Sequence, residues 1–269
     1  NILCEILKKL KLFTESFVLM INNERLYIQG MDSSHIIIFD LNLSSDWFDT
    51  IDVKENNNYE FGLHTTILAK ILSIKSEKQY MRIYNEENNI DKLGIDFING
   101  NESDYDKFFE IPLMDIDYDL LEIPTTDYDA SIIMEAKNYK NIIDDFNGLD
   151  FQDVKIKCCE ENIEFSSESS QGNMQLCVKE AQIHKYEIIQ DEEIKNNFNL
   201  KFISKMCQFK VSKYISIQQS NGIPIEIKYL LNPTADLDGN DDNSSIEKLT
   251  NHWFKFYLAP CTSDDDELY

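Results

Sequence analysis

The chain has 269 residues, of which 42% are hydrophobic, enough to bury one large core or two modest ones. Its 49 acidic residues outnumber the 25 basic ones and give a formal net charge of −24, which argues against non-specific binding of nucleic acid. Contact with DNA would therefore need a local concentration of positive charge.

Cysteine usage and hydropathy indicate a soluble, intracellular protein. The six cysteines show no C-x-x-C spacing, so a reducing compartment is the simpler expectation. No apolar stretch approaches the roughly 20 residues of a membrane span, and the start lacks a signal-peptide pattern. We expect no membrane partner. Asn1 is not an initiator methionine, so we also expect further residues ahead of it.

The first part of the chain predicts two helices and six strands. Apolar residues from Ile2 to Phe17 recur at helical spacing, and a second amphipathic helix is predicted over residues 64–74. Strand-like segments between these helices occur at residues 17–21, 26–29 and 36–43. Further strands are predicted at residues 80–84, 93–98 and 108–113.

The second part repeats this plan from Tyr139 onward. A helical stripe ends near Leu149, and a fourth helix is predicted over residues 199–209, stopping near Phe209. Predicted strands occur at residues 154–159, 163–166, 174–178, 214–218, 224–231 and 253–258. The sequence therefore predicts an α+β duplication in which each copy has two helices on a many-stranded antiparallel sheet.

Two irregular segments interrupt the repeated plan. Residues 114–126 are acidic, fit neither period and include Pro124, as expected of an extended connector. They separate an N-terminal domain at 1–113 from a C-terminal domain at 127–269. Residues 232–251 are rich in Asp, Asn and Ser and are predicted to form a long surface loop.

Three short motifs resemble signatures of the proliferating cell nuclear antigen family, the DNA sliding clamps of eukaryotes and their viruses. They are Met31-Asp32-Ser33-Ser34-His35, the connector start at residues 113–117, and Tyr257-Leu258-Ala259-Pro260. The resemblance covers nearly the whole chain. It implies duplicated clamp domains, three copies closed head to tail into a ring, helices lining the hole, and no enzymatic activity.

Each predicted helix turns lysines away from its apolar stripe at about 3.6 residues per turn. These lysines are Lys8 and Lys11, Lys70, Lys137 and Lys140, and Lys201 and Lys205 on the four helices in order. Ordinary solvated helix faces are the alternative explanation. If the faces line a common channel, they predict weak, salt-sensitive contact with the DNA backbone that is independent of sequence.

The resemblance also implies a partner-peptide pocket. Family members receive short peptides of the pattern Gln-x-x-aliphatic-x-x-aromatic-aromatic, and an apolar surface beside an extended connector suits such a segment. The positions that match are Met31, His35, Leu121, Ile123, Pro124, Pro224, Tyr257, Leu258, Ala259 and Pro260. For Met31 and Leu258, a simple core position is the alternative.

Two positions depart from the family pattern. Pro112 falls in the strand that would pair with a neighbouring subunit, where a missing N–H weakens the ladder. Glu160 stands where many relatives carry a lysine that is modified by ubiquitin or SUMO. Pro112 and the long loop at residues 232–251 leave a subunit of a heterotrimeric clamp and a monomeric viral processivity factor open as alternatives.

Acidic clusters raise one enzymatic alternative, a metal-dependent hydrolase. Asp115, Asp117 and Asp119 alternate, so an extended chain would show them on one face. Asp236, Asp238, Asn240, Asp242 and Glu247 approach the offsets of a calcium loop, although Asp241 occupies the place of the required glycine. We expect no metal, cofactor or catalytic residue.

The sequence thus predicts a homotrimeric DNA sliding clamp that acts as a polymerase processivity factor. Its expected partners are duplex DNA, a DNA polymerase, a clamp loader, and replication and repair proteins that carry the peptide motif. The expected location is the nucleus, or a cytoplasmic viral factory if the gene belongs to a large DNA virus.

Overall fold

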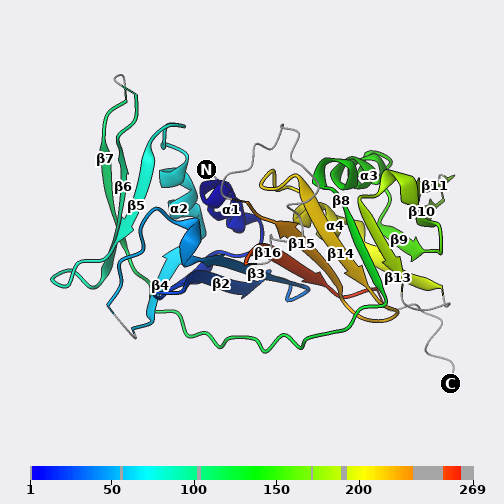
Figure 1. The fold of residues 1–269 in the computed structure, drawn as a ribbon, viewed down its shortest axis with the longest axis horizontal. Coiled ribbons are helices and arrows are strands. Elements are labelled where there is room, and N and C mark those ends of the chain that lie inside the picture. Colours follow the sequence, from blue (N-terminus) through cyan, green and yellow to red (C-terminus); the bar gives the residue numbers. More distant parts are fainter. Residues whose placement is uncertain are drawn as a thin grey trace. The chain divides into compact units, whose positions relative to one another are not determined.

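The computed structural model describes residues 2–54, 57–101, 104–170, 172–188, 193–232 and 251–261. The chain divides into two compact units, shown in Figure 1. Unit 1 comprises Asn1–Ser33 and Leu41–Leu121, and unit 2 comprises Ser34–Asp40 and Glu122–Tyr269. The chain passes from unit 1 to unit 2 between Leu121 and Glu122, inside the predicted connector.

Unit 1 contains two packed helices and two antiparallel sheets. The helices are α1 (Ile2–Lys9), continued by the short η1 (Leu10–Leu12), and α2 (Thr65–Leu72). One sheet has the order β3–β2–β1–β4, with β1 (Ser16–Ile21), β2 (Arg25–Met31), β3 (Ile37–Ser44, of which residues from Leu41 onward belong to this unit) and β4 (Tyr59–His64). The other has the order β5–β6–β7, with β5 (Tyr80–Tyr84), β6 (Lys92–Ile98) and β7 (Lys107–Pro112).

Unit 2 repeats this arrangement. Its packed helices are α3 (Ala136–Gly148) and α4 (Leu200–Met206). The sheet β11–β10–β9–β13 contains β9 (Asp153–Cys158), β10 (Asn162–Ser169), β11 (Gly172–Lys179) and β13 (Ile194–Asn199). Neighbours in the second sheet run β12–β8–β14–β15–β16, with β8 (Ala130–Glu135), β12 (Lys185–Ile188), β14 (Tyr214–Gln219), β15 (Ile225–Leu230) and β16 (His252–Leu258).

Local chemistry sets where the second helix of each unit begins. The His64 ring accepts a hydrogen bond from the Thr66 N–H at 3.2 Å, and the Asn199 side chain accepts one from the Lys201 N–H at 3.1 Å. These contacts satisfy amides that the first helical turn leaves without an intrahelical partner. Side-chain capping at equivalent places is a further sign of the duplication.

Aromatic side chains fill the core of unit 2 beside α4. Phe209 lies edge-on to Phe254, with 4.9 Å between ring centroids, and contacts Phe256 at 5.5 Å. The buried Tyr229 hydroxyl donates to the Met206 carbonyl at 2.8 Å, so its polar end is satisfied. Each fully buried ring stabilises the fold by about 1.5–3 kcal/mol relative to exposure. The end of α4 and the segment that follows it are therefore packed directly on β15 and β16.

The structure departs from the sequence prediction in several elements. Four strands were not predicted, namely β4, β8, β12 and β13. The fourth helix ends at Met206 and not near Phe209, because Cys207 already leaves helical geometry and Phe209 turns into the core. No helix within the described ranges is long and apolar enough to cross a membrane.

Candidate DNA-facing and partner-binding surfaces

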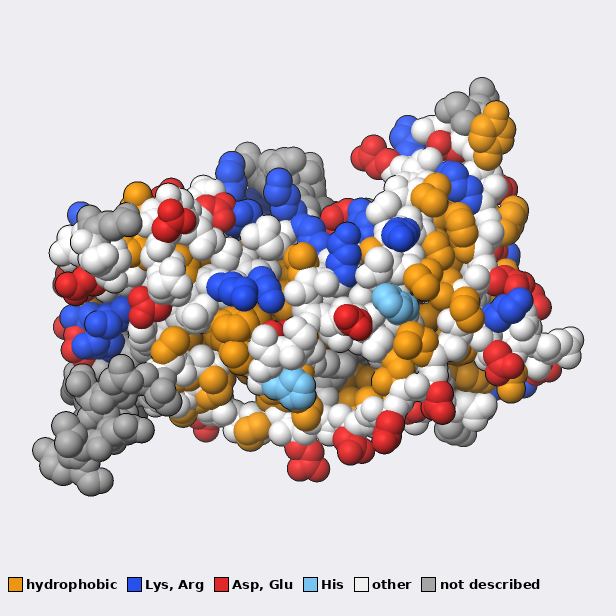
Figure 2. Space-filling model, turned by 180° about the vertical axis from the view of Figure 1, so that it is seen from behind, with side chains coloured by type: hydrophobic (Ala, Val, Ile, Leu, Met, Phe, Trp, Pro, Cys, Tyr) orange, Lys and Arg blue, Asp and Glu red, His pale blue; other side chains and the backbone are white. Residues whose placement is uncertain are grey.

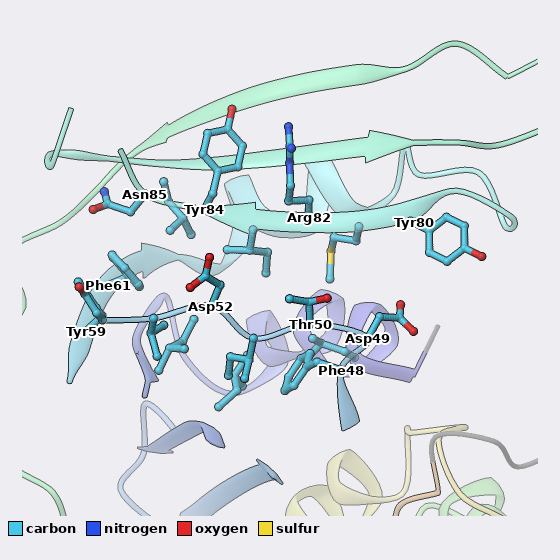
Figure 3. A pocket seen from close by; sticks show the side chains of 18 of the residues that line it. Phe48, Asp49, Thr50, Asp52, Tyr59, Phe61, Tyr80, Arg82, Tyr84 and Asn85 are labelled. Carbon is cyan, nitrogen blue, oxygen red and sulfur yellow. The ribbon is translucent and has the colours of Figure 1, made fainter. Parts of the chain in front are cut away.

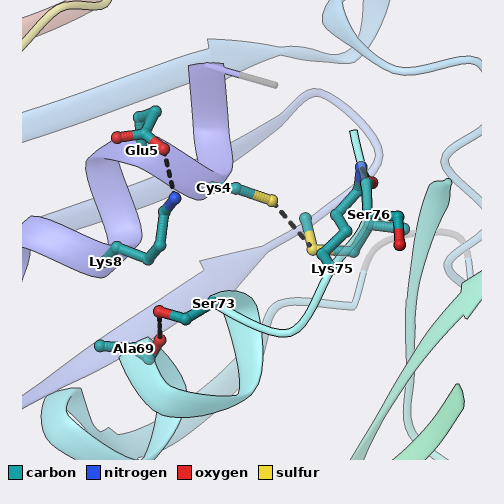
Figure 4. A network of polar contacts seen from close by, with 8 residues as sticks. Cys4, Glu5, Lys8, Ala69, Ser73, Lys75 and Ser76 are labelled. Atoms are coloured by element: carbon teal, nitrogen blue, oxygen red, sulfur yellow. Dashed lines mark hydrogen bonds and ion pairs between the residues drawn. The ribbon is translucent and has the colours of Figure 1, made fainter. Parts of the chain in front are cut away.

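In unit 1, the predicted DNA-facing lysines lie on the solvent side of α1, η1 and α2. Lys8 is half-buried and forms an ion pair with Glu5 one turn earlier, as Figure 4 shows. Lys11 and Lys70 are exposed, whereas Leu7 and Leu68 on the opposite faces are buried. The lysines therefore point away from the core, as the helical periodicity predicts.

In unit 2, Lys137 and Lys201 are exposed, and Lys140 and Lys205 are half-buried. Lys140 forms an ion pair with Asp144 one turn later, and the Lys205 ammonium lies 5.6 Å from the centre of the Phe202 ring. Figure 2 shows Lys and Arg side chains interspersed with Asp and Glu side chains on one face of the molecule. Two of the seven lysines are thus partly neutralised by neighbours on the same helix.

In unit 1, the connector end is held by a side chain that the sequence did not single out. Gln29 on β2 accepts a hydrogen bond from the Leu121 N–H at 2.7 Å and donates to the Leu121 carbonyl at 3.1 Å. Met31 ends β2 and is half-buried. Both predicted pocket residues of unit 1 therefore depend on β2, one as its last residue and one through Gln29.

The turn after Met31 has a constrained backbone. His35 is exposed and has a φ of 59°, a left-handed conformation that few residues other than glycine adopt. The Ser33 N–H donates to the Phe13 carbonyl at 3.0 Å, which ties the start of this turn to the end of η1. The Met31–His35 motif thus encodes a fixed turn.

In unit 2, the predicted pocket residues fall into three groups by exposure. Pro124, Pro224 and Ala259 are exposed, and Ile123, Tyr257 and Pro260 are half-buried. Leu258 is only 1% exposed and belongs to the core. Leu258 therefore packs in the core at the end of β16, whereas the other predicted pocket residues of unit 2 remain accessible.

A polar cluster that sequence reasoning missed lies beside these apolar residues. Glu226 on β15 is in register with Tyr257 on β16, and the Lys255 Nζ lies 3.6 Å from the Glu226 Oε2. The Tyr128 hydroxyl donates to the Pro224 carbonyl at 3.1 Å. Burial, assisted by the Glu226 charge, raises the pKa of Tyr128 to about 12 and raises that of Tyr257 as well. Cross-strand register brings Glu226 and Tyr257 together, and Tyr128 joins them from the segment that precedes β8.

A neighbouring contact joins distant parts of the sequence within unit 2. The Trp253 Nε1 donates to the Asp40 Oδ1 at 3.1 Å, and Asp40 is only 8% exposed. The Lys255 ammonium lies 4.9 Å from the centre of the Trp253 ring. These contacts fix β16 against the first residues of β3.

Two cavities lie away from both predicted surfaces. A groove of about 1040 Å³ in unit 1 follows the edge of β5, between Tyr80, Arg82 and Tyr84 on one side and residues 48–54 on the other, as Figure 3 shows. In unit 2, β14 occupies the place of β5, and there β8 pairs along its whole length. A polar pocket of about 330 Å³ in unit 2 is lined by Asp153, Lys155 and Asn197 among others.

The described residues contain no group of three or more His, Cys, Asp or Glu side chains arranged to hold a metal ion. Asp115, Asp117 and Asp119 are exposed on the connector. The calcium-loop candidates Asp236, Asp238, Asn240, Asp242 and Glu247 lie outside the described residues. The geometry therefore gives no support to the hydrolase alternative.

Each unit contains a sheet that ends in an edge strand. β7 is the last strand of β5–β6–β7, and β11 is the last strand of β11–β10–β9–β13. Pro112 is the final residue of β7, in register with Lys92 of β6. Its missing N–H therefore affects only the end of the edge, because the five preceding residues keep their amides.

The family models decide the relationship. The model described as proliferating cell nuclear antigen, N-terminal domain, matches residues 1–121, and that for the C-terminal domain matches residues 122–237. The chain belongs to the proliferating cell nuclear antigen family. It is a DNA sliding clamp and not an enzyme. The alternative interpretations, namely a subunit of a heterotrimeric clamp, a monomeric processivity factor and a metal-dependent hydrolase, are not favoured.

Individual relatives agree with the family models. The proliferating cell nuclear antigen of Chaetomium thermophilum is 26% identical over 251 residues, covering 91% of this chain and 88% of the relative. The crystal structure of PCNA from Thermococcus kodakaraensis matches with a TM-score of 0.81 at 16% identity, covering 96% of each chain. The second comparison confirms the duplicated clamp fold. Family membership also implies a trimeric ring around DNA that serves a polymerase.

Proposed function

We propose that three copies of this chain close into a ring that encircles duplex DNA without sequence preference and carries a DNA polymerase along it. The observation that supports this most directly is the pairing of helices in each unit, α1 with α2 and α3 with α4, with lysines on their solvent sides. A local basic lining lowers the repulsion that a chain of net charge −24 would otherwise meet from phosphates.

Ring closure would use the two edge strands. A strand edge exposes unpaired amide and carbonyl groups, and head-to-tail pairing of β7 with β11 of the next copy satisfies both edges. Repeating one such contact closes a ring when the rotation that relates neighbouring copies is a whole fraction of a full turn. We propose a homotrimer on this basis.

Partner proteins would dock through the peptide motif Gln-x-x-aliphatic-x-x-aromatic-aromatic. The accessible residues Ile123, Pro124, Pro224, Tyr257 and Pro260 offer an apolar contact surface, and Gln29 presets the connector at Leu121. Because the connector backbone is already held in place, less conformational entropy is lost when a peptide binds to it. A DNA polymerase, a clamp loader, and replication and repair proteins are the proposed partners. The nucleus is the proposed location, or a cytoplasmic viral factory for a viral gene.

Clamp-dependent DNA synthesis on a primed circular template tests the proposal. We expect long products only when the chain is loaded, and loss of stimulation when the circle is linearised, because a topological link slides off free ends. The peptide surface is tested separately with a fluorescent motif peptide. Replacing Leu121 and Ile123 together by Ala should weaken its binding by about 1–3 kcal/mol. Unchanged affinity would remove the peptide assignment and leave the ring untouched.

A further inference from the structure

A buried carboxylate lies beside the proposed peptide surface. Glu226 is 7% exposed and projects from β15 on the face opposite to its core neighbours Ile225 and Ile227. Its cross-strand partner is Tyr257, one of the proposed peptide-contacting residues. The surface is therefore not uniformly apolar, because a negative charge lies within reach of it.

The partners of this carboxylate do not use all of its acceptor capacity. Tyr257 lies opposite Glu226 across the strand pair, and the Lys255 Nζ lies 3.6 Å from the Glu226 Oε2, which is longer than an ordinary hydrogen bond. Tyr128 donates elsewhere, to the Pro224 carbonyl at 3.1 Å. An ionised carboxylate offers roughly four acceptor sites. Glu226 is only 7% exposed, so few water molecules can reach the remaining acceptor sites.

A bound aromatic ring would change the surroundings of Glu226. A phenylalanine ring lying over Tyr257 excludes water and offers the carboxylate no donor, which is costly for a buried acceptor. A tyrosine ring of the same shape replaces the lost water with its hydroxyl. Hydrogen bonds to an ionised acceptor are stronger than neutral ones, so the difference between the two rings is enlarged here.

We propose that Glu226 is a specificity-determining residue, which makes the peptide surface prefer tyrosine to phenylalanine at one of the two aromatic positions of the motif. This inference rests on the proposed partner-peptide function and goes beyond it, because it names the side chain that selects among motif peptides. The selecting contact is a phenol hydroxyl donating to the Glu226 carboxylate.

Three synthetic peptides test the inference. They share the motif and one aliphatic residue, and differ only in the final two rings, which are Phe-Phe, Tyr-Phe or Phe-Tyr. We expect one hydroxyl-bearing peptide to bind the full chain about 10-fold or more tightly than the Phe-Phe peptide, by titration calorimetry. In Glu226→Val this advantage should disappear, and the Phe-Phe peptide should bind at least as well as before.

Two further variants separate selection from folding. Glu226→Gln keeps an acceptor and should retain part of the tyrosine preference. Glu187→Val makes the same chemical change at an exposed position of β12 and should keep the preference in full. Val suits a strand, so the thermal unfolding curve of Glu226→Val checks that unit 2 still folds.

The outcomes distinguish this inference from the proposed function. Equal binding of the three peptides to the natural chain would overturn the role of Glu226 and leave the peptide surface in place. A preference that survives Glu226→Val would overturn it as well. If none of the peptides binds, the partner-peptide function itself is wrong, and the inference is lost with it.

Discussion

The side-chain amide of Gln29 holds both backbone groups of Leu121, accepting from its N–H at 2.7 Å and donating to its carbonyl at 3.1 Å. The Gln29 side chain thus pairs with both backbone groups of one connector residue, as a residue of a neighbouring strand would. The two partners are 92 positions apart in the sequence, so no local sequence pattern indicates this contact.

The first prediction concerns this contact. Gln29→Ala removes two hydrogen bonds, each contributing about 0.5–1.5 kcal/mol, so the connector should loosen and motif peptides should bind more weakly. Hydrogen exchange at residues 119–123 should speed up, and calorimetry should show the lower affinity. Gln152→Ala, an exposed glutamine in unit 2, is the matched control. Unchanged exchange at Leu121 would contradict the structural role of Gln29.

The second prediction concerns ring closure. Gln175 lies in the middle of β11, where a proline removes an amide and bends the edge. Gln175→Pro should therefore shift the mass in solution from trimer toward monomer, as measured by sedimentation at several protein concentrations. Gln175→Ala keeps the amide and should remain trimeric. A trimer of unchanged stability in the proline variant would show that β11 is not the contact.

The third prediction concerns the DNA-facing lysines. Lys201→Glu with Lys205→Glu reverses charge on α4 and should reduce clamp-stimulated synthesis, most strongly at low salt where phosphate contacts count most. If both lysines contact phosphates, their loss should reduce the slope of log affinity against log salt by about 0.9 per contact.

Lys155→Glu with Lys185→Glu provides the control for that experiment, because both lysines are exposed on strands of unit 2 and give the same change in net charge. The control should preserve stimulation, and neither double variant should alter the trimer mass. Equal effects of the two double variants would mean that overall charge matters and that α4 has no special place.

The fourth prediction concerns stability in alkaline solution. Burial raises the pKa of five tyrosines in unit 2, which are Tyr128, Tyr139, Tyr186, Tyr229 and Tyr257. The unfolded chain ionises its tyrosines near pH 10, whereas folded Tyr128 holds its proton to about pH 12. Their contribution to stability is therefore complete below pH 10 and is lost as the pH rises above it.

Urea unfolding at pH 8 to 12 measures this loss. Tyr128→Phe cannot ionise, so the fall in free energy of unfolding between pH 10 and 12 should be shallower than in the natural chain. Tyr105→Phe, which changes an exposed ring in unit 1, should leave the curve unaltered. The same slope in all three proteins would show that Tyr128 does not contribute.

Apolar periodicity predicted all four helices, because each buries a stripe that is visible in sequence, such as Leu3, Ile6 and Leu7 on α1. Periodicity did not predict β8 and β13. Each of these strands leads directly into a helix, so the two-residue period of the strand runs into the 3.6-residue period of the helix without a break. β12 has only four residues, too few for a convincing alternation. Short strands of this kind are formed by their neighbours in the sheet and not by their own propensity.

Helical spacing alone predicted the lysine positions. Four of the seven lysines are exposed and three are half-buried, and their contact with DNA stays a prediction. Glu226 and Gln29 were not predicted, because each acquires its role from a partner across a strand pair or across the connector. A single sequence contains no register, so such pairs become visible only when the sheet is known. Leu258 is only 1% exposed, which favours the core position that the sequence analysis kept as its alternative.

Unit 2 includes residues 34–40, which lie inside the sequence of unit 1. Cutting the chain at the connector would therefore not yield two self-sufficient halves: the C-terminal piece would lose Asp40, and the Trp253 indole would lose its acceptor. The duplicated plan suggests two interchangeable modules, but the interleaved chain allows neither to be removed, transplanted or replaced alone. A C-terminal fragment that keeps the contact between Trp253 and Asp40 must therefore also carry residues 34–40.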